Sequence, residues 1–347
     1  MERGNFDLRS ALSRNDSICC RILRESGRQR LKYGLRERNS AAVILLGTKG
    51  VQTIAKLLEK SPSMRPLVDT KDLTAVEGDV ELCYRSIFPD AHEHFVSQAF
   101  GWAQACFEGR YSGYLPIDAR YHDLEHTLQG TLCMVRILHG RHQAQVQPLC
   151  TRRLFELGLL AILLHDTGYL KRTNDTEGTG AKYTLVHVRR SIDFAGQLLG
   201  KRGFGPTDIR AVQNMISCTG LNVDLESVPF QDDIEKIVGF ALGTGDLLGQ
   251  MAAQDYVEKL PILFEEFAEA QRFTGADSSS RIIFGDAEDL MRKTPQFWEH
   301  YVRPKIEGDF QGLYAFLNDP YPDGPNPYLA RIEVSLRRLR EKFAHAA

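Results

Sequence analysis

Helical periodicity is the feature that most constrains the fold of this chain. From about residue 76 onward, apolar residues recur at the spacing of one helix face, and the alternating β-branched runs typical of strands are nearly absent. We therefore expect an all-α fold, a helical bundle. The predicted helices cover residues 76–86, 90–108, 122–139, 151–165, 184–199, 207–217, 231–250, 255–271, 282–292, 296–303 and 326–344.

A loose boundary near residue 75 divides the chain into two regions. The segment "KSPSMRPLVDTKD" (60–72) contains two prolines among polar residues, which is typical of a linker. We expect residues 1–75 to form an N-terminal extension, whose role the sequence does not indicate. Residues 76–347 should form the main helical domain. Within that domain, the Gly- and Thr-rich segment 170–183 is long for a connection between helices, and such loops are usually functional or mobile.

The composition is that of a globular protein in a reducing compartment. Of 347 residues, 43% are hydrophobic and 25% charged, and the net charge is -2, so a dedicated nucleic-acid surface is not expected. Seven cysteines form no CxxC pair, which favours reduced thiols and a cytoplasmic protein. The longest apolar run, "LGLLAILL", is too short to span a bilayer, so no membrane partner is expected, whereas a homo-oligomer stays open.

Three short segments carry the chemistry. "YHDLEHTLQG" (121–130) places His122 and His126 four residues apart, and both imidazoles would share one face of a helix. "LLHDTGY" ends an apolar helix with adjacent His165 and Asp166, an unfavourable place for a carboxylate unless a partner compensates it. "FALGTGDLLGQMA" isolates Asp246 among small and apolar residues. A divalent metal could compensate the carboxylate of Asp166, because imidazole and carboxylate groups both suit Zn, Mn, Fe or Mg.

This H…HD…D pattern resembles the HD-domain metal-dependent phosphohydrolase superfamily, and the "YHxxxH" start resembles its cyclic-nucleotide phosphodiesterase branch. The resemblance covers roughly residues 90–250 and implies an HD-domain, phosphodiesterase-like helical bundle over 76–347. It implies that His126, His165, Asp166 and Asp246 bind a metal. It also implies that His122 is the general acid that protonates the leaving oxygen, a role that suits the titration range of an imidazolium.

Further residues are candidates for a second metal or for the substrate. In dinuclear members of the superfamily, a histidine on the helix after the HD pair helps to bind the second metal, and His187 is the candidate here for that role or for a phosphate contact. Lys182 and Arg190 belong to a cluster of basic residues that would suit an anionic substrate, although basic side chains are more often plain surface. Gln296 and Phe297 resemble weakly the purine-binding glutamine of the phosphodiesterases; an ordinary helix start after Pro295 is the alternative.

The chain differs from that branch in two places. Asp123 stands where the phosphodiesterases carry asparagine, and no further histidine follows the HD pair closely. The resemblance as a whole implies hydrolysis of a small phosphoester by a metal-activated water, with a cyclic nucleotide or a related phosphodiester as substrate. A nucleotidase or phosphomonoesterase, a di-iron oxygenase and a non-catalytic regulatory protein of the same fold are the alternatives.

Overall fold

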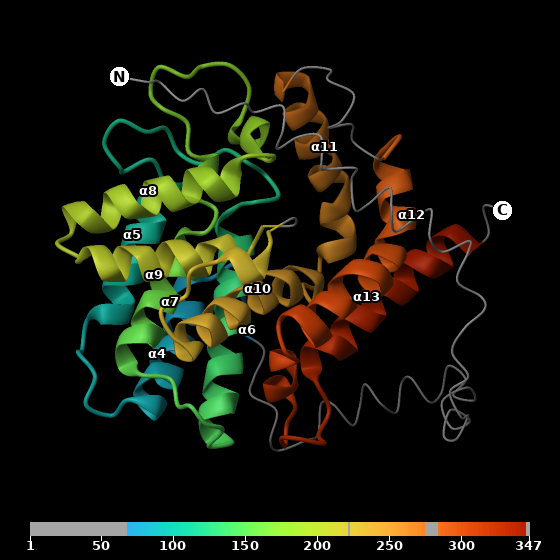
Figure 1. Cartoon of the computed structure of the whole chain (residues 1–347). Helices are drawn as coiled ribbons and strands as arrows, with labels where there is room; N and C mark the ends of the chain where they lie inside the picture. Colours follow the sequence, from blue (N-terminus) through green and yellow to red (C-terminus); the bar gives the residue numbers. More distant parts are fainter. Residues whose placement is uncertain (1–67, 221–222, 275–283, 345–347) are drawn as a thin grey trace. The chain divides into compact units, whose positions relative to one another are not determined.

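The computed structural model describes residues 68–220, 223–274 and 284–344, and these residues form ten α-helices and no β-strand. The prediction of an all-α fold is confirmed. Most of the expected N-terminal extension, residues 1–67, lies outside the described residues. The helices, labelled as in Figure 1, are α4 (Leu73–Ile87), α5 (Phe95–Phe107), α6 (Leu124–Gln143), α7 (Arg152–Leu164), α8 (His187–Lys201), α9 (Pro206–Ser217), α10 (Asp233–Met251), α11 (Tyr256–Thr274), α12 (Ala287–Phe297) and α13 (Pro327–Ala344).

Side-chain caps explain where several helices begin. The carboxylate of Asp72 accepts the N–H groups of the first turn of α4. Thr151 and Asp232 do the same for α7 and α10 through their side-chain oxygens. Each cap satisfies backbone donors that have no partner inside the helix. The helix starts that were predicted from periodicity alone therefore lie within a few residues of capping side chains.

Two predicted boundaries in the C-terminal part are wrong. The sequence suggested separate helices over 282–292 and 296–303, with a helix start after Pro295. Instead, Pro295 lies inside α12, which runs on into the π-helical segment η4 (Trp298–Val302) and is followed by a second one, η5 (Lys305–Asp309). Proline lacks a backbone donor and usually ends a helix, so the sequence pattern favoured a break that the backbone does not make.

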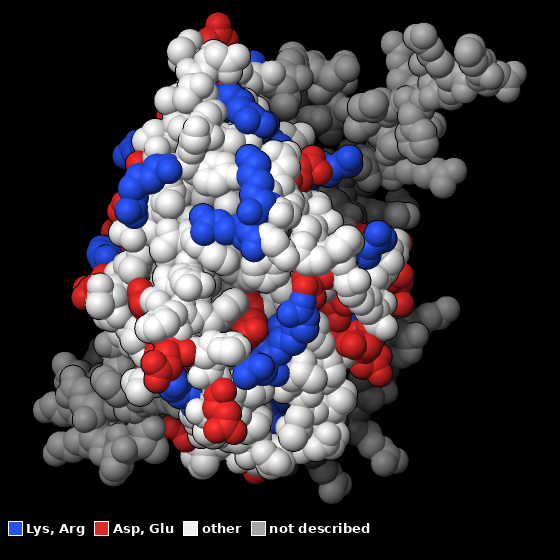
Figure 2. Space-filling view, turned by 90° about the vertical axis from the view of Figure 1, so that its left-hand side faces the viewer, with Lys and Arg blue, Asp and Glu red and all other residues white. Residues whose placement is uncertain are grey.

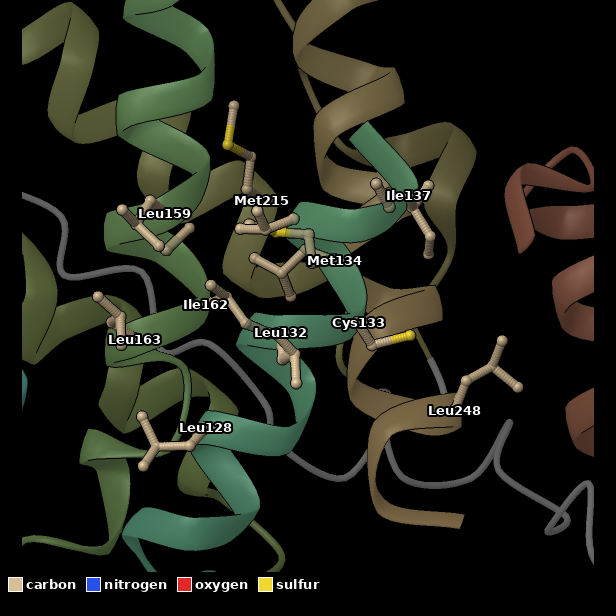
Figure 3. Close-up of a cluster of buried hydrophobic side chains, with 14 of the residues drawn as sticks. Leu128, Leu132, Cys133, Met134, Ile137, Leu159, Ile162, Leu163, Met215 and Leu248 are labelled. Carbon is tan, nitrogen blue, oxygen red and sulfur yellow. The ribbon is translucent and has the colours of Figure 1, made fainter. Parts of the chain in front are cut away.

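The core is built around α6, which is buried on nearly every side between α4, α7 and α10. Figure 3 shows Leu128, Leu132 and Ile137 of α6 together with Leu159 and Ile162 of α7. All five side chains are at most 4% exposed. Apolar burial of this kind is the main stabilising contribution in a helical bundle. α6 is therefore the central helix, and α4, α7 and α10 pack around it.

Glycines allow α6 and α10 to cross very closely, and this is the most extensive helix pair among the described residues. A Cβ atom at Gly245 would lie 2.8 Å from the backbone nitrogen of Met134, and one at Gly249 would lie 2.6 Å from the carbonyl of Gln129. The Cβ position of Gly130 lies 3.4 Å from the Cα of Asp246. Backbones can approach so closely only where side chains are absent. The crossing brings the two helices together at the level of Asp246.

The segment 170–183 is tied to α11 and to the loop before α6. Both carboxylate oxygens of Glu269 bind Thr179, one through its backbone N–H and the other through its hydroxyl. Asp118 accepts the N–H of Gly180 at 2.6 Å and pairs with Lys171 at 2.8 Å. The long connection expected from the sequence is thus held in place by buried or half-buried polar contacts.

The surface of the described residues carries charges of both signs. In Figure 2, basic side chains form small groups separated by uncharged surface, and acidic side chains are interspersed among them. Among the helices that the structure describes, none combines the length and the apolar character needed to cross a bilayer.

Candidate metal centre and the residues around it

Four side chains from three parts of the fold converge in the interior. Nε2 of His126 lies 3.3 Å from Oδ2 of Asp166 and 3.2 Å from Oδ1 of Asp246. Nε2 of His165 lies 3.3 Å and 3.5 Å from the same two oxygens. His126, His165 and Asp166 are buried and each offer one ligand atom, with these atoms within 4.8 Å of one another, so this group could bind a metal ion. The structure thus brings together the residues that the sequence placed on separate helices.

The start of α6 sets the position of His126. Asp123 is the N-cap residue, and its Oδ1 accepts the backbone N–H of His126 at 2.8 Å. The helix therefore begins at Leu124, and the predicted helix over 122–139 is wrong at its start. The N-cap residue Asp123 has an extended backbone, so the helix begins after it and His122 lies outside the helix. The imidazoles of His122 and His126 still meet edge to face, with ring centroids 5.3 Å apart.

The end of α7 sets the position of the adjacent His165 and Asp166. His165 is the C-cap residue, and its Nδ1 lies 2.7 Å from the carbonyl oxygen of Ile162. A carbonyl only accepts, so Nδ1 carries a proton, and Nε2 is the ring nitrogen that faces the two carboxylates. Asp166 then begins the short 3₁₀-helix η1 (Thr167–Tyr169). The chain turns immediately after the buried helix, which leaves both side chains at its end.

The unsatisfied atoms of this cluster fit a bound cation. His165 Nε2, Asp166 Oδ2 and Asp246 Oδ1 are buried and make no hydrogen bond. Buried polar atoms without partners are rare, and each calls for an explanation such as an ion. Ligand atoms about 2.0–2.2 Å from one tetrahedral ion lie roughly 3.3–3.6 Å from each other. The nitrogen–oxygen separations of 3.2–3.5 Å in the cluster agree with that spacing.

The electrostatics of the cluster favour a positive charge at its centre. Burial alone would lower the pKa of His126, but the carboxylates of Asp166 and Asp246 raise it to about 10. Burial likewise opposes ionisation of these two carboxylates, yet His126 and His165 hold both of their pKa values below the ordinary range. Without a metal, the proton on His126 compensates the acids. A cation that binds here must displace that proton, so its affinity should rise with pH.

His122 lies at the rim of this cluster and is held by an acid. Its Nδ1 lies 2.6 Å from Oε2 of Glu266 on α11, whose other oxygen accepts the N–H of Tyr121 at 2.7 Å. The side chain of His122 is 14% exposed, compared with 4% for His126. Burial would raise the pKa of Glu266, but His122 lowers it below the ordinary value. Glu266 is therefore ionised, and its carboxylate accepts a hydrogen bond from Nδ1 of His122.

His187 faces the other oxygen of the central aspartate. Its Nε2 lies 3.7 Å from Oδ1 of Asp166, whereas Oδ2 faces His126 and His165. Nδ1 of His187 donates to the carbonyl of Thr184 at 2.6 Å, which leaves Nε2 as the free ring nitrogen. Burial lowers the pKa of His187 and favours its neutral form. The two oxygens of Asp166 are thus shared between two sets of imidazole nitrogens.

The two basic candidates for substrate binding make contacts within the protein. Nζ of Lys182 contacts the carboxylate of Asp175 and the carbonyl of Glu177. The guanidinium of Arg190 donates to the carbonyls of Gly168 and Leu170 at 2.7 and 2.6 Å. These contacts hold the segment after the HD pair in place. The structure therefore puts Arg190 next to the site, although its donors point at the backbone.

Gln296 and Phe297 lie at the C-terminal end of α12. Gln296 is exposed, and the ring of Phe297 stacks on that of Tyr301 with centroids 5.0 Å apart. α12 packs mainly on α11 and α13, whereas the histidines and aspartates come from α6, α7, α8 and α10. The structure does not bring these two residues into contact with the cluster.

Sequence reasoning missed two residues of the site. Glu266 could have been found, because it falls on the apolar face of α11 three residues after Leu263 and four before Ala270, where an acid is unexpected. Tyr169 had no such signal. It lies 4.7 Å from the ring of His122 and 4.8 Å from that of His187, and nothing in the spacing of "HDTGY" indicates that position.

Comparison with known proteins adds one similarity. A family model described as Npun_R2479-like matches residues 172–317, which is less than half of the chain. This match includes His187, Asp246 and Glu266 and begins just after the segment that carries His165 and Asp166. No curated protein is detectably similar in sequence. The chain is therefore similar over residues 172–317 to a family whose description names no activity.

Proposed function

We propose that this protein is a metal-dependent phosphoester hydrolase of the HD-domain superfamily, acting as a phosphodiesterase on a cyclic nucleotide or a related small phosphodiester. The observation that carries the proposal is the pairing of two functional units. One is the buried cluster of two imidazoles and two carboxylates, and the other is the pair formed by His122 and Glu266 at its rim. A structural ion network would not need a histidine held by its own acid beside it.

The cluster would hold the metal through nitrogen and oxygen ligands. His126 and His165 would bind through Nε2, and Asp166 and Asp246 through one oxygen each. When bound, a divalent ion such as Zn, Mn, Fe or Mg supplies Lewis-acid stabilisation of phosphoryl oxygens and makes water a better nucleophile. The unprotonated Nε2 of His187 and the second oxygen of Asp166 would provide part of a second metal site.

The role of His122 follows from its contacts. Nδ1 donates a hydrogen bond to the carboxylate of Glu266, so the ring is oriented and Nε2 is directed away from the acid. In the protonated ring, Nε2 can donate a proton to the departing alkoxide of an ester. This arrangement suits an ester whose leaving group needs protonation.

Phosphomonoester hydrolysis and a regulatory role are the main competitors, and one experiment separates them. Metal content is measured by mass spectrometry on purified protein, followed by chelation and reloading with Zn, Mn, Fe or Mg. Hydrolysis is then followed on cyclic nucleotides, on an alkyl and an aryl phosphodiester, and on an aryl phosphomonoester. We expect metal-dependent hydrolysis that is faster for the diesters than for the monoester. Absence of metal-dependent hydrolysis of all these substrates would refute the proposed function.

Two variants with a matched control assign the residues. Asp166→Asn should lose metal and activity together, because a neutral amide leaves the charge of the cation undercompensated. Asp193→Asn on α8, where the side chain is 60% exposed, should change neither. His122→Ala should keep the metal and lower turnover of the alkyl diester by about 10²–10⁴-fold, with a clearly smaller loss on the aryl diester. Full metal occupancy in Asp166→Asn would show that this residue is not a ligand.

A further inference from the structure

One tyrosine ring stacks on both His122 and His187 beside the cluster. The ring of Tyr169 stacks on that of His122 and on that of His187, at centroid distances of 4.7 and 4.8 Å and interplanar angles of 19° and 20°. The imidazoles themselves are 5.9 Å apart. Tyr169 is 0% exposed. A side chain so completely buried does not reach a substrate, so any contribution it makes acts through the rings it touches.

Hydrogen bonds and close packing against α8 fix the backbone around Tyr169. The N–H of Tyr169 donates to the carbonyl of Asp166 at 3.1 Å, and the N–H of Gly168 donates to the hydroxyl of Ser191 at 2.8 Å. A Cβ atom at Gly168 would lie 2.0 Å from the carbonyl oxygen of His187. The glycine therefore lets η1 lie directly against the first turn of α8. This close contact places the tyrosine ring against both imidazoles.

We infer that Tyr169 is a positioning residue that sets the orientation of His122 and His187 relative to Asp166. This inference rests on the proposed function, because it takes His122 as the proton donor. Glu266 fixes one edge of the His122 ring through Nδ1, and that hydrogen bond alone leaves the ring free to rotate about it. The flat face of Tyr169 removes that rotation. The same tyrosine ring also stacks on the ring of His187, whose Nε2 faces Oδ1 of Asp166.

Two substitutions separate the ring from its hydroxyl group. Tyr169→Phe keeps the aromatic face, and Tyr169→Leu removes it while keeping an apolar side chain in the space. Phe155→Leu is the matched control, since Phe155 is also 0% exposed and stacks on Tyr84 with centroids 5.4 Å apart, on α7 but away from the cluster. The control reports what the loss of a buried stacked ring does to the fold in general.

The first readout uses the full-length protein without metal. Histidine ring resonances are recorded by NMR with ¹³C-labelled histidine. Tyr169→Leu should shift the ring signals of both His122 and His187, because the ring current of the stacked tyrosine is lost, whereas Tyr169→Phe and Phe155→Leu should leave them near their wild-type positions. Unchanged signals in Tyr169→Leu, or equal shifts in the control, would overturn the inference.

The second readout is turnover with metal bound. Tyr169→Leu should keep its metal but lower kcat for an alkyl phosphodiester by on the order of 10- to 100-fold, the loss expected from misplacing a catalytic group by about 1 Å. An activated aryl diester should lose less, and Tyr169→Phe should lose little on either substrate. Equal losses in Tyr169→Phe and Tyr169→Leu would assign the role to the hydroxyl group and overturn the inference.

The two proposals fail in different ways. If wild-type protein hydrolyses no phosphoester, the proposed function fails, and the ring signals of the metal-free protein still test the stack. If Tyr169→Leu does not fold, nuclear Overhauser contacts in the wild-type protein decide. Contacts from the tyrosine ring to both imidazoles support the positioning role, and their absence overturns it.

Discussion

The close crossing of α6 and α10 predicts that one added methyl group will affect both the fold and the metal site. Gly249→Ala places a Cβ atom 2.6 Å from the carbonyl carbon and oxygen of Gln129 and 2.7 Å from the nitrogen of Gly130. These are backbone atoms of a buried helix, so they yield only if the helices separate. Gly78→Ala on α4 is the matched control, because Gly78 is exposed and its Cβ would meet nothing within 4 Å.

The magnitudes follow from two opposing effects. Replacing glycine by alanine within a helix stabilises by about 1 kcal/mol. Overpacking of a core typically costs about 1–3 kcal/mol, and a contact with backbone atoms belongs at the upper end. We therefore expect Gly249→Ala to lower the free energy of unfolding of the metal-free protein by about 2 kcal/mol. Gly78→Ala should raise it by up to about 1 kcal/mol.

Denaturant unfolding with and without metal measures both consequences. At a metal concentration of about 100 times Kd, wild-type protein should gain about 2.7 kcal/mol. Separation of α6 from α10 moves Asp246 away from His126, and a tenfold weaker Kd would reduce that gain by about 1.4 kcal/mol. If Gly249→Ala proved as stable as Gly78→Ala, the reasoning from the crossing would be refuted. If a destabilised Gly249→Ala protein still gained the full free energy of unfolding from metal, the link between the helix crossing and the metal site would be refuted.

Three further changes test contacts around the site. Burial would raise the pKa of Glu266, but His122 lowers it. The carboxylate should therefore stabilise the fold above the unfolded-state pKa near 4.5 and lose that contribution as the pH falls. Glu266→Gln should flatten the acid side of a curve of stability against pH. Equal acid sensitivity in wild-type and variant protein would contradict this. Gly168→Ala should destabilise by about 1–3 kcal/mol in thermal or denaturant unfolding, since its Cβ would collide with the carbonyl of His187. Arg190→Lys cannot reproduce two hydrogen bonds to neighbouring carbonyls and should lower activity without a change in KM, whereas a raised KM would indicate a substrate contact.

The sequence predicted the elements of this fold better than their ends. Helical periodicity identified α6, α7 and α10, because each presents a continuous apolar face to the core. It failed at the start of α6, where Asp123 caps the helix and leaves His122 outside it. It failed again at Pro295, since the usual effect of proline on a helix was overridden by the surrounding packing.

The candidate site was predictable where polar residues stood out against apolar neighbours. His165, Asp166 and Asp246 are conspicuous in their segments, and the structure places them within contact distance of His126. Glu266 belongs to a helix rich in acids, and only its place on the apolar face of α11 distinguishes it from Glu265 and Glu269. The position of Tyr169 depends on how η1 packs against α8, which is a tertiary contact that spacing within the sequence does not encode.

The distance in sequence between α6 and α10 has a kinetic consequence. His126 and Asp246 meet only after a loop of about 120 residues has closed, and such non-local contacts form late and slowly. A metal that needs both residues therefore finds no complete site in the unfolded chain or in early intermediates. It should leave the folding rate nearly unchanged and slow unfolding instead, because it stabilises contacts that are absent from the transition state. The bound ion would then extend the lifetime of the native protein without guiding the path by which it forms.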